Sequence, residues 1–186
     1  MQKYLELFGI DLKYIKLKYL IDRIFSLFIL IILSPFFLII SLIIFISINE
    51  SPFFSCYRAG EKNKKFKLYK FKTMRSINSK VNINKITLRK DKRVYKFGQF
   101  LRITKIDELP QILNILKGEM SFIGPRPEDY IFVNKFYLKK QFETLNLKPG
   151  LASPGSLFNF VFIEQRVNNE EEYLEFYLQI KLFLEL

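Results

Sequence analysis

The sequence predicts an α+β protein in which a membrane-embedded helix precedes a compact domain with several helices and a small β-hairpin or sheet. Three observations support this fold class. Residues 24–48 form an apolar run without a charged side chain. Short apolar stretches, separated by basic residues and turn signals, follow this run and are typical of strands in a small sheet. Amphipathic stretches beyond residue 107 have the spacing of helices.

The composition limits the chemistry that the chain can perform. A chain of 186 residues can form one domain with a real core, and a net charge of +12 indicates anionic partners such as nucleic acid, phosphorylated metabolites or anionic lipid. The absence of histidine excludes a Ser-His-Asp triad and histidine metal sites. The single cysteine, Cys56, excludes an internal disulfide and cysteine zinc sites. Catalysis therefore has to use carboxylates, lysine, tyrosine or hydroxyl groups, together with a hard cation that binds oxygen.

Residues 24–48 are long enough to cross a hydrocarbon core of about 30 Å at about 1.5 Å per residue. Ser34 and Pro35 lie near the middle, where proline removes the hydrogen bond to the Ile31 carbonyl and kinks the helix. Basic residues flank the run on both sides, and the positive-inside rule would place both ends in the cytoplasm. From the residues alone, a kinked spanning helix and a re-entrant helix that returns to the same side both remain open.

The chain divides into three predicted segments, which are residues 1–19, the membrane helix at 20–48 and the remaining domain at 49–186. In the first segment, apolar residues recur at steps of three and four: Leu5, Phe8, Leu12, Ile15 and Tyr19. With lysines between them, this pattern favours an amphipathic helix on the headgroup surface. A helix packed on the domain is the alternative, because the apolar face is wide.

Within the 49–186 domain, residues 53–57 and 66–71 predict two strands of a hairpin around a turn-like stretch, and residues 76–90 predict a polar loop. A helix is expected at 107–117, with Gly118 in the position after its end and Thr104 or a neighbour as its N-cap.

Two further helices are expected at 127–145 and 169–185, with the irregular stretch KPGLASPGS between them.

Asp107 and Glu108 are adjacent carboxylates at the start of the 107–117 helix. Such pairs are more often solvated charges than catalytic groups. However, Pro110 fixes the helix start close to them. Both carboxylates then lie at the positive end of the helix dipole, which also binds phosphate.

Basic residues flank this pair, among them Arg102 and Lys105, and Arg126 follows in a Gly-Pro-Arg-Pro turn. A stiff turn can hold a guanidinium so that it binds phosphate through two parallel bonds, although an ordinary surface arginine is the alternative. Lys70 alternates with apolar residues, as in a half-buried strand.

Taken in order, these motifs resemble those of one known family. The stretches that carry the resemblance are KYLIDR at 18–23, Ser34-Pro35, FKLYKFKTMRS at 66–76, FLRITKIDELPQILNILKGEMSFIGPRPE at 100–128 and LKPGL at 147–151. They are similar to motifs of the monotopic phosphoglycosyl transferases, which are bacterial sugar transferases. The resemblance covers about residues 18–155.

This resemblance implies an enzyme that moves a sugar-1-phosphate from a UDP-sugar to polyprenyl (undecaprenyl) phosphate and releases UMP at the start of glycoconjugate biosynthesis. It implies a re-entrant helix bent at Ser34-Pro35, with the catalytic domain on the cytoplasmic face of the bacterial inner membrane. The expected partners are the UDP-sugar, polyprenyl phosphate and the phospholipid membrane, without nucleic acid. A homo-oligomer is compatible with these expectations.

The resemblance also implies roles for individual residues. Asp107 would be the nucleophile that forms a covalent phosphosugar intermediate, and Glu108 would bind Mg²⁺. An ionised carboxylate needs no general base to attack phosphorus, which suits a chain without histidine. The expected phosphate or nucleotide contacts are Lys70, Arg102, Arg126 and Arg58.

The sequence departs from the family pattern after Gly150, where LASPGSLFNFVFIEQ replaces the usual glycine-leucine-tryptophan stretch and leaves the sugar specificity open. Lys72 also replaces the usual arginine of the strand motif, with the charge retained. A non-catalytic, membrane-anchored basic module that binds anionic lipid or nucleic acid is the alternative function. The net charge favours this alternative, whereas the intact Asp107-Glu108 pair and the Gly-Pro-Arg-Pro turn oppose it.

Overall fold

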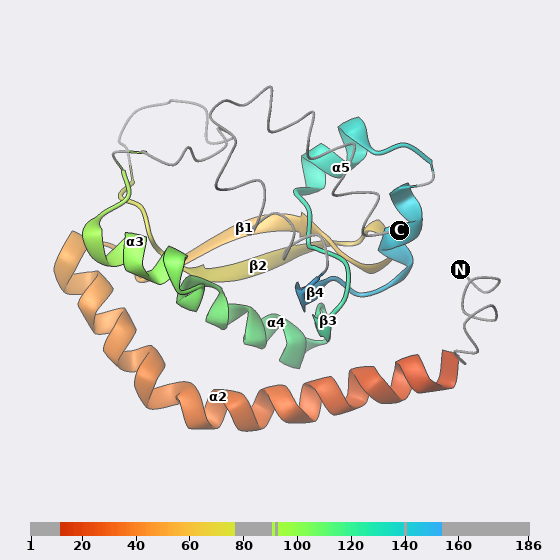
Figure 1. Ribbon diagram of the computed structural model, residues 1–186, viewed down its shortest axis with the longest axis horizontal. Coiled ribbons are helices and arrows are strands. Elements are labelled where there is room, and N and C mark those ends of the chain that lie inside the picture. The colour runs from red at the N-terminus through yellow and green to blue at the C-terminus, as the bar shows by residue number, and fades with distance from the viewer. Residues whose placement is uncertain (1–11, 77–90, 92, 140, 154–186) are drawn as a thin grey trace.

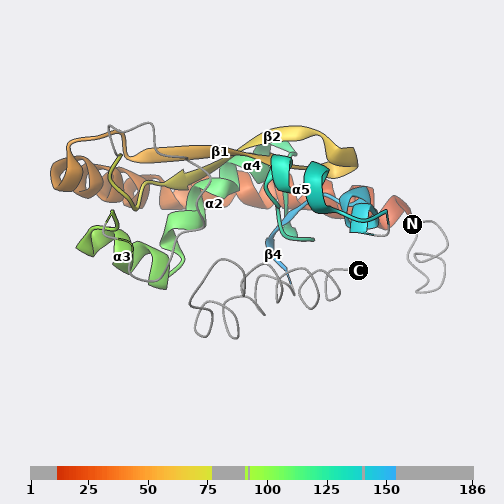
Figure 2. The same cartoon turned by 90° about the horizontal axis from the view of Figure 1, so that it is seen from above.

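The computed structural model describes residues 12–76, 91, 93–139 and 141–153. Within them the α+β class is confirmed, because one long helix lies along a domain that contains two small sheets (Figure 1, Figure 2). The helices are α2 (Leu12–Ile48), α3 (Lys96–Ile103), α4 (Ile112–Lys117) and α5 (Tyr130–Phe136). The 3₁₀ turns are η1 (Glu61–Asn63), η2 (Ile106–Gln111) and η3 (Gln141–Asn146). The strands are β1 (Phe53–Ala59), β2 (Lys65–Phe71), β3 (Ser121–Ile123) and β4 (Gly150–Ala152).

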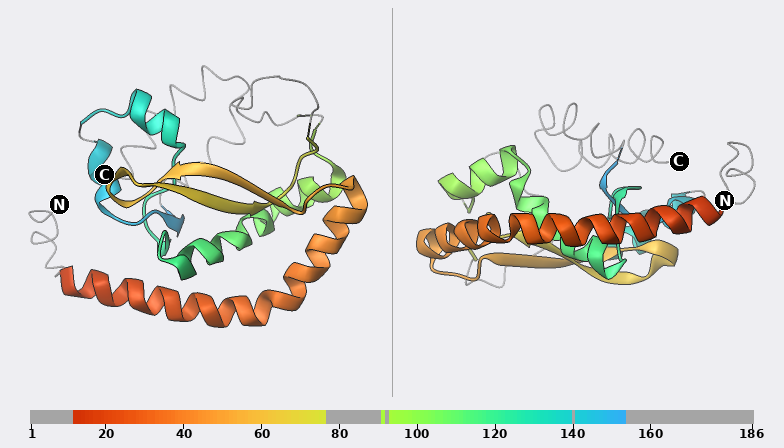
Figure 3. Two further views of the ribbon diagram at one scale, coloured as in Figure 1. Left: turned by 180° about the vertical axis from the view of Figure 1, so that it is seen from behind. Right: turned by 90° about the horizontal axis from the view of Figure 1, so that it is seen from below.

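Helix α2 bends along its length (Figure 1, Figure 3). It contains Pro35, which cannot donate a backbone hydrogen bond to the Ile31 carbonyl. The hydroxyl of Ser34 donates to this carbonyl at 2.8 Å instead, so the acceptor keeps a partner. The best 18-residue window has a mean hydropathy of 3.1 and is 11% buried, so length and composition qualify α2 as a candidate membrane helix.

Polar side chains bind the first half of α2 to the domain. Lys18 donates to the Asp22 carboxylate at 2.8 Å and also to the hydroxyl of Ser121 in β3. The same hydroxyl donates to Asp22 at 2.6 Å. Asp22 and Ser121 are both buried. A buried carboxylate requires such partners, so this network fixes α2 against β3.

Two further contacts extend this attachment along α2. The backbone N–H of Lys148 donates to the Tyr19 hydroxyl at 3.0 Å, and Nε of Arg23 donates to the Leu116 carbonyl at 3.1 Å. The second contact places a cation at the C-terminal end of α4, where the helix dipole favours positive charge. Helix α2 is continuous through residues 19 and 20, and the described part of the 1–19 segment packs on the domain at Lys18 and Tyr19.

The predicted hairpin is confirmed as β1 and β2, which pair antiparallel. Because side chains alternate along a strand, Phe66, Leu68 and Lys70 share one face of β2. Phe66 and Leu68 are buried in a core with Ile115 of α4 and with Met120. Packing of these apolar residues therefore turns the Lys70 side chain toward the η2–α4 segment.

The opposite face of β2 packs on the second half of α2. Phe71 is buried there with Ile40 and Ile44 of α2 and with Leu101 of α3. The ring of Phe37 meets Phe71 edge to face, with 5.3 Å between ring centroids. The η2–α4 segment, which carries the two adjacent carboxylates, contacts both β2 and α2 and lies between the hairpin and α2 (Figure 1).

The helix predicted at 107–117 has two parts, because η2 forms its first turns and α4 the remainder. Gly118 ends α4 in the left-handed region at φ 80°, as expected. Of the two options for the N-cap, Thr104 or a neighbour, the structure excludes Thr104, because its hydroxyl donates to the Phe100 carbonyl at 2.9 Å at the end of α3. Lys105 takes the cap position of η2 with φ 58°, a conformation unusual for a residue with a β-carbon.

The helix predicted at 127–145 is wrong as a single element, because the structure divides it into α5 and η3. The reason is tertiary packing. Val133 of α5 and Leu145 of η3 are both buried against Ala59 of β1, and a straight helix could not bring both to this point.

The stretch KPGLASPGS is also not wholly irregular, since it contains β4, which pairs parallel to β3. A three-residue strand is too short to show the alternation that identifies strands in a sequence. Residues 1–11, the predicted helix at 169–185 and nearly all of the predicted loop at 76–90 lie outside the described residues.

Candidate active site

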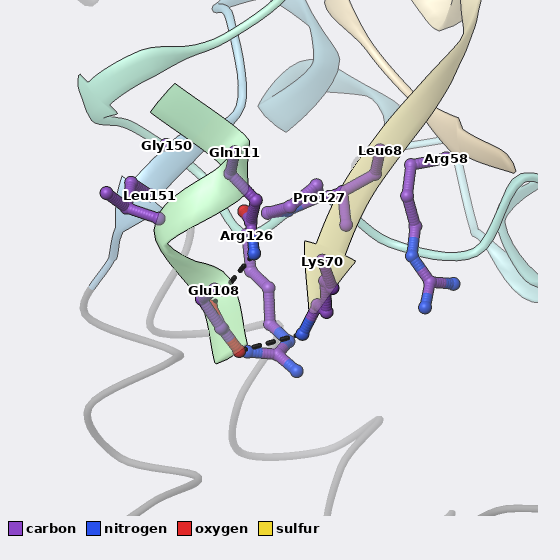
Figure 4. Close-up of a pocket in the computed structure, with 9 residues that line it drawn as sticks. All are labelled: Arg58, Leu68, Lys70, Glu108, Gln111, Arg126, Pro127, Gly150 and Leu151. Atoms are coloured by element: carbon purple, nitrogen blue, oxygen red, sulfur yellow. Dashed lines mark hydrogen bonds and ion pairs between the residues drawn. The ribbon is translucent and has the colours of Figure 1, made fainter. Parts of the chain in front are cut away.

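A contact between β2 and η2 forms the centre of a pocket (Figure 4). Nζ of Lys70 donates to Oε1 of Glu108 at 2.8 Å, and Nε2 of Gln111 donates to Oε2 of the same carboxylate at 3.1 Å. Both oxygens of Glu108 therefore have a donor, which fixes the orientation of the carboxylate. The guanidinium of Arg126 lies beside this group in the close-up. The pocket is lined by Arg58, Leu68, Lys70, Glu108, Gln111, Arg126, Pro127, Gly150 and Leu151.

Asp107 precedes Glu108 in η2 and is 8% exposed. Its Oδ1 atom is buried and accepts no hydrogen bond from the part of the chain that the structure describes. Burial raises the pKa of Asp107 above its ordinary value. Nearby positive charges act to lower this pKa, and Lys70 has the largest effect among them. A buried acceptor without a donor is costly and requires an explanation, of which a catalytic role, a bound water and a bound ion are examples.

The pKa of Glu108 shifts in the opposite direction. Burial works against the ionised form, but the charge and hydrogen bond of Lys70, together with the charge of Arg126, lower the pKa of Glu108 to about 2. Glu108 is therefore ionised at neutral pH. The pKa values of the two neighbouring carboxyl groups shift in opposite directions because Glu108 has donors on both oxygens, whereas Oδ1 of Asp107 has none among the described residues.

The two carboxylates are a donor set that suits Mg²⁺. This cation commonly takes one or two carboxylates and obtains its other ligands from water and substrate phosphates. Oδ1 of Asp107 offers an unused acceptor, and Glu108 is ionised beside it. Within the described residues, no cluster of three or more histidine, cysteine or acidic side chains could hold a metal ion. A cation bound by Glu108 would share this carboxylate with Lys70, because Nζ of Lys70 already contacts Oε1.

Two glycines hold the turn that carries Arg126. The N–H of Gly150 donates to the Pro125 carbonyl at 2.7 Å, and the N–H of Gly124 donates to the Ala152 carbonyl at 3.1 Å. A β-carbon on Gly150 would lie 2.1 Å from the Gly124 nitrogen, so the two backbones can approach only because these residues have no side chains. This close approach brings the turn and β4 together at the pocket.

The structure brings three of the four predicted phosphate-binding residues to the pocket, which are Lys70, Arg126 and Arg58. Arg102 does not line it but lies in the last turn of α3, where its charge acts on Asp107.

Sequence reasoning missed two buried polar residues that position this site. Gln111 is 2% exposed and orients Glu108. Asn114 is fully buried, where its Nδ2 donates to the Lys67 carbonyl at 2.8 Å and its Oδ1 accepts from the backbone N–H of Tyr69 at 3.2 Å. Asn114 therefore attaches α4 to the edge of β2 next to Lys70. Their spacing gave a signal, since residues 108, 111 and 114 follow one another in steps of three along a helix.

Comparisons with known proteins show which family the sequence resembles. A family profile described as bacterial sugar transferase matches residues 13–184. A Bacillus subtilis protein, named provisionally as an undecaprenyl-phosphate N-acetylgalactosaminyl 1-phosphate transferase, is 39% identical over 124 residues, which are 67% of this chain and 69% of that protein.

Two longer relatives match a smaller share of their own length. The UDP-glucose:undecaprenyl-phosphate glucose-1-phosphate transferase of Escherichia coli is 31% identical over 166 residues, which are 82% of this chain and 35% of that protein. The UDP-N-acetylgalactosamine-undecaprenyl-phosphate N-acetylgalactosaminephosphotransferase of Aeromonas hydrophila is 44% identical over 47% of this chain and 21% of its own length. With the profile match along nearly the whole sequence, the chain belongs to the bacterial sugar transferase family.

Proposed function

We propose that this protein transfers a sugar-1-phosphate from a UDP-sugar to undecaprenyl phosphate or a related polyprenyl phosphate, with release of UMP. The observation that carries the proposal is the buried Asp107 carboxylate, whose Oδ1 has no donor among the described residues, next to an ionised Glu108 and the cations Lys70 and Arg126. The names of the relatives support the same class of reaction. The product would begin the synthesis of a surface glycan or glycoprotein.

In the first step, a carboxylate oxygen of Asp107 attacks the phosphorus that carries the sugar. The bond from this phosphorus to the bridging oxygen of the diphosphate breaks, and the oxygen leaves with UMP. An acyl phosphate that links Asp107 to the sugar remains. Because the carboxylate is poorly hydrated, little solvent has to be displaced before attack.

In the second step, a phosphate oxygen of the polyprenyl phosphate attacks the same phosphorus. The bond between phosphorus and Asp107 breaks, which restores the carboxylate and forms polyprenyl diphosphate-sugar. Both reactants are anions, so the reaction needs positive charge rather than a general base. Lys70, Arg126 and Arg58 line the pocket and would supply this charge to the phosphates.

Mg²⁺ would be held by Glu108, whose carboxylate lines the pocket. When bound, the cation would neutralise the charge of the diphosphate. Gln111 keeps the Glu108 carboxylate in one orientation for this purpose.

The enzyme class can be tested by UMP release from a panel of UDP-sugars in the presence of polyprenyl phosphate and Mg²⁺. We expect release with at least one sugar, and we expect it to require both the lipid phosphate and the cation. A control reaction without polyprenyl phosphate should release no more than one UMP per protein molecule. If the folded protein releases no UMP with any sugar of the panel, the proposal of a UDP-sugar donor is wrong.

We also propose that α2 is re-entrant, which places both of its ends and the catalytic domain on the cytoplasmic face of the bacterial inner membrane. The proline and the hydroxyl bond at Ser34 support a bend inside the apolar part. The test uses a variant that carries Cys56→Ser and Gln2→Cys, so that it has one thiol. An impermeant thiol reagent should label this variant only after the cells are opened, and labelling of intact cells would contradict re-entry.

A further inference from the structure

We propose that Asp129 is a positioning residue that holds Arg58 at the pocket and thereby sets the affinity for the nucleotide diphosphate donor. This inference rests on the proposed function. Oδ2 of Asp129 accepts a hydrogen bond from Nη1 of Arg58 at 3.0 Å. Arg58 lines the pocket, whereas Asp129 does not. The carboxylate would therefore act on the donor only through the guanidinium.

The two oxygens of Asp129 have separate partners. Oδ1 accepts from the backbone N–H groups of Ile131 and Phe132 at 2.9 and 3.2 Å and caps the start of α5. Oδ2 contacts Arg58. Because the capping bonds fix the carboxylate to the backbone, the oxygen that faces the arginine has a defined position. The side chain of Arg58 is 27% exposed, so its guanidinium remains accessible to a ligand.

The backbone supports the same contact. Arg58 and Asp129 form an isolated antiparallel bridge, and the N–H of Ala59 donates to the Glu128 carbonyl at 2.9 Å. The segment after the Gly-Pro-Arg-Pro turn thus pairs with the end of β1. Asp129 is only three positions beyond Arg126, so one short segment presents one arginine to the pocket and orients a second.

Arg58 has a geometry distinct from that of Lys70 and Arg126. The latter two gather around Glu108, whereas Arg58 stands apart from them in the close-up (Figure 4). A nucleotide diphosphate carries a second phosphate and a nucleoside beyond the phosphorus that is attacked, so a cation that stands apart from Glu108 can bind this more distant part. We expect Arg58 to contact the part of the nucleotide diphosphate that lies away from Glu108, because its planar guanidinium can make two parallel bonds to phosphate.

The sharpest variant is Asp129→Asn. The amide oxygen can still accept the two capping bonds, since asparagine is among the best N-cap residues. The amide N–H₂ group then faces the guanidinium, and two donors cannot bond to each other. This variant therefore separates the contact with Arg58 from the cap, whereas Asp129→Ala removes both. Glu143→Gln is the matched control, because it removes one negative charge from the exposed surface of η3.

The experiment measures binding of UDP, in the presence of Mg²⁺, to the full-length wild type, to Asp129→Asn, to Arg58→Ala and to the double variant. We expect Asp129→Asn to weaken UDP binding about two- to fivefold, because this factor corresponds to the free energy that a partly exposed ion pair contributes. Arg58→Ala should weaken it about tenfold or more. In the Arg58→Ala background, Asp129→Asn should have no further effect. The melting temperature of Asp129→Asn should equal that of the wild type, and Glu143→Gln should match the wild type throughout.

Turnover gives an independent readout. Asp129→Asn should raise KM for the UDP-sugar by the same factor and leave kcat unchanged. The inference would be overturned if Asp129→Asn weakened UDP binding equally in the wild-type and Arg58→Ala backgrounds. A fall in kcat without a change in KM, or tighter UDP binding by Asp129→Asn, would also overturn it. Tighter binding would mean that the carboxylate competes with phosphate for the guanidinium. Absence of UDP binding by the wild type would contradict the proposed donor, and with it this inference.

Discussion

Asp107→Asn is expected to reduce sugar-phosphate transfer by at least about a thousandfold, which corresponds to about 4 kcal/mol in the activation barrier. The amide of the variant carries no negative charge and cannot form the acyl phosphate. Its size matches that of the original side chain, and Oδ1 of Asp107 has no donor within the described structure that an amide would repel. Folding should therefore be preserved while chemistry is lost.

Intact mass spectrometry separates the nucleophile from other roles of Asp107. The wild type, incubated with a UDP-sugar and Mg²⁺ but without polyprenyl phosphate, should gain the mass of one sugar-phosphate. Asp107→Asn should gain none, although its melting temperature matches that of the wild type. An adduct on Asp107→Asn, or turnover at the wild-type rate, would assign the nucleophile to another residue.

Glu108→Gln is expected to lower kcat about a hundredfold and to shift the Mg²⁺ titration to higher concentrations. The change removes the charge that makes Glu108 a ligand for a cation, and it leaves Lys70 without the carboxylate that it contacts at 2.8 Å. Lys70 should then become more mobile. The loss therefore has two sources, which are weaker metal binding and a misplaced ammonium group.

The Mg²⁺ titration distinguishes these two sources. A lower kcat with an unchanged Mg²⁺ midpoint would remove Glu108 from the metal site and leave it only the role of orienting Lys70. Glu143→Gln is the control for the loss of one negative charge, because it lies on η3 and does not line the pocket. Its Mg²⁺ titration and kcat should equal those of the wild type.

The parts of the fold that could be predicted are those in which local sequence and burial agree. The hairpin is predicted by two short runs with strand character, residues 53–57 and 66–71, on either side of a turn-like stretch, and the structure confirms it. Gly118 was expected after the helix because glycine has little strain in the left-handed region, and its φ of 80° agrees.

The predictions that were wrong concern features that depend on contacts between residues far apart in the sequence. Nothing local indicates that Lys105 adopts a φ of 58° or that η2 precedes α4, because this geometry follows from how η2 packs on β2. The division of the predicted 127–145 helix likewise follows from the joint burial of Val133 and Leu145. Helix periodicity describes the faces of an element but not the point at which a chain folds back.

The candidate site shows the same contrast. Asp107 and Glu108 could be named from the sequence because their motif resembles that of a known family. The structure then added Gln111 and Asn114, whose importance comes from burial and from hydrogen bonds to partners. The two residues were present in the same motif, but only the positions of their partners reveal what they do.

The attachment of α2 to the domain also has a consequence for synthesis on the ribosome. Ser121 follows Lys18 by 103 positions, and Lys148 follows Tyr19 by 129. At about 5–20 residues per second, a ribosome needs on the order of 5–20 s to make the first of these partners. Lys18 and Asp22 are one helical turn apart and pair at 2.8 Å in the folded protein, so this ion pair needs no partner from the later part of the chain. If α2 enters the membrane as proposed, it can therefore do so before the catalytic pocket exists, and the pocket would then assemble against a helix that is already inserted.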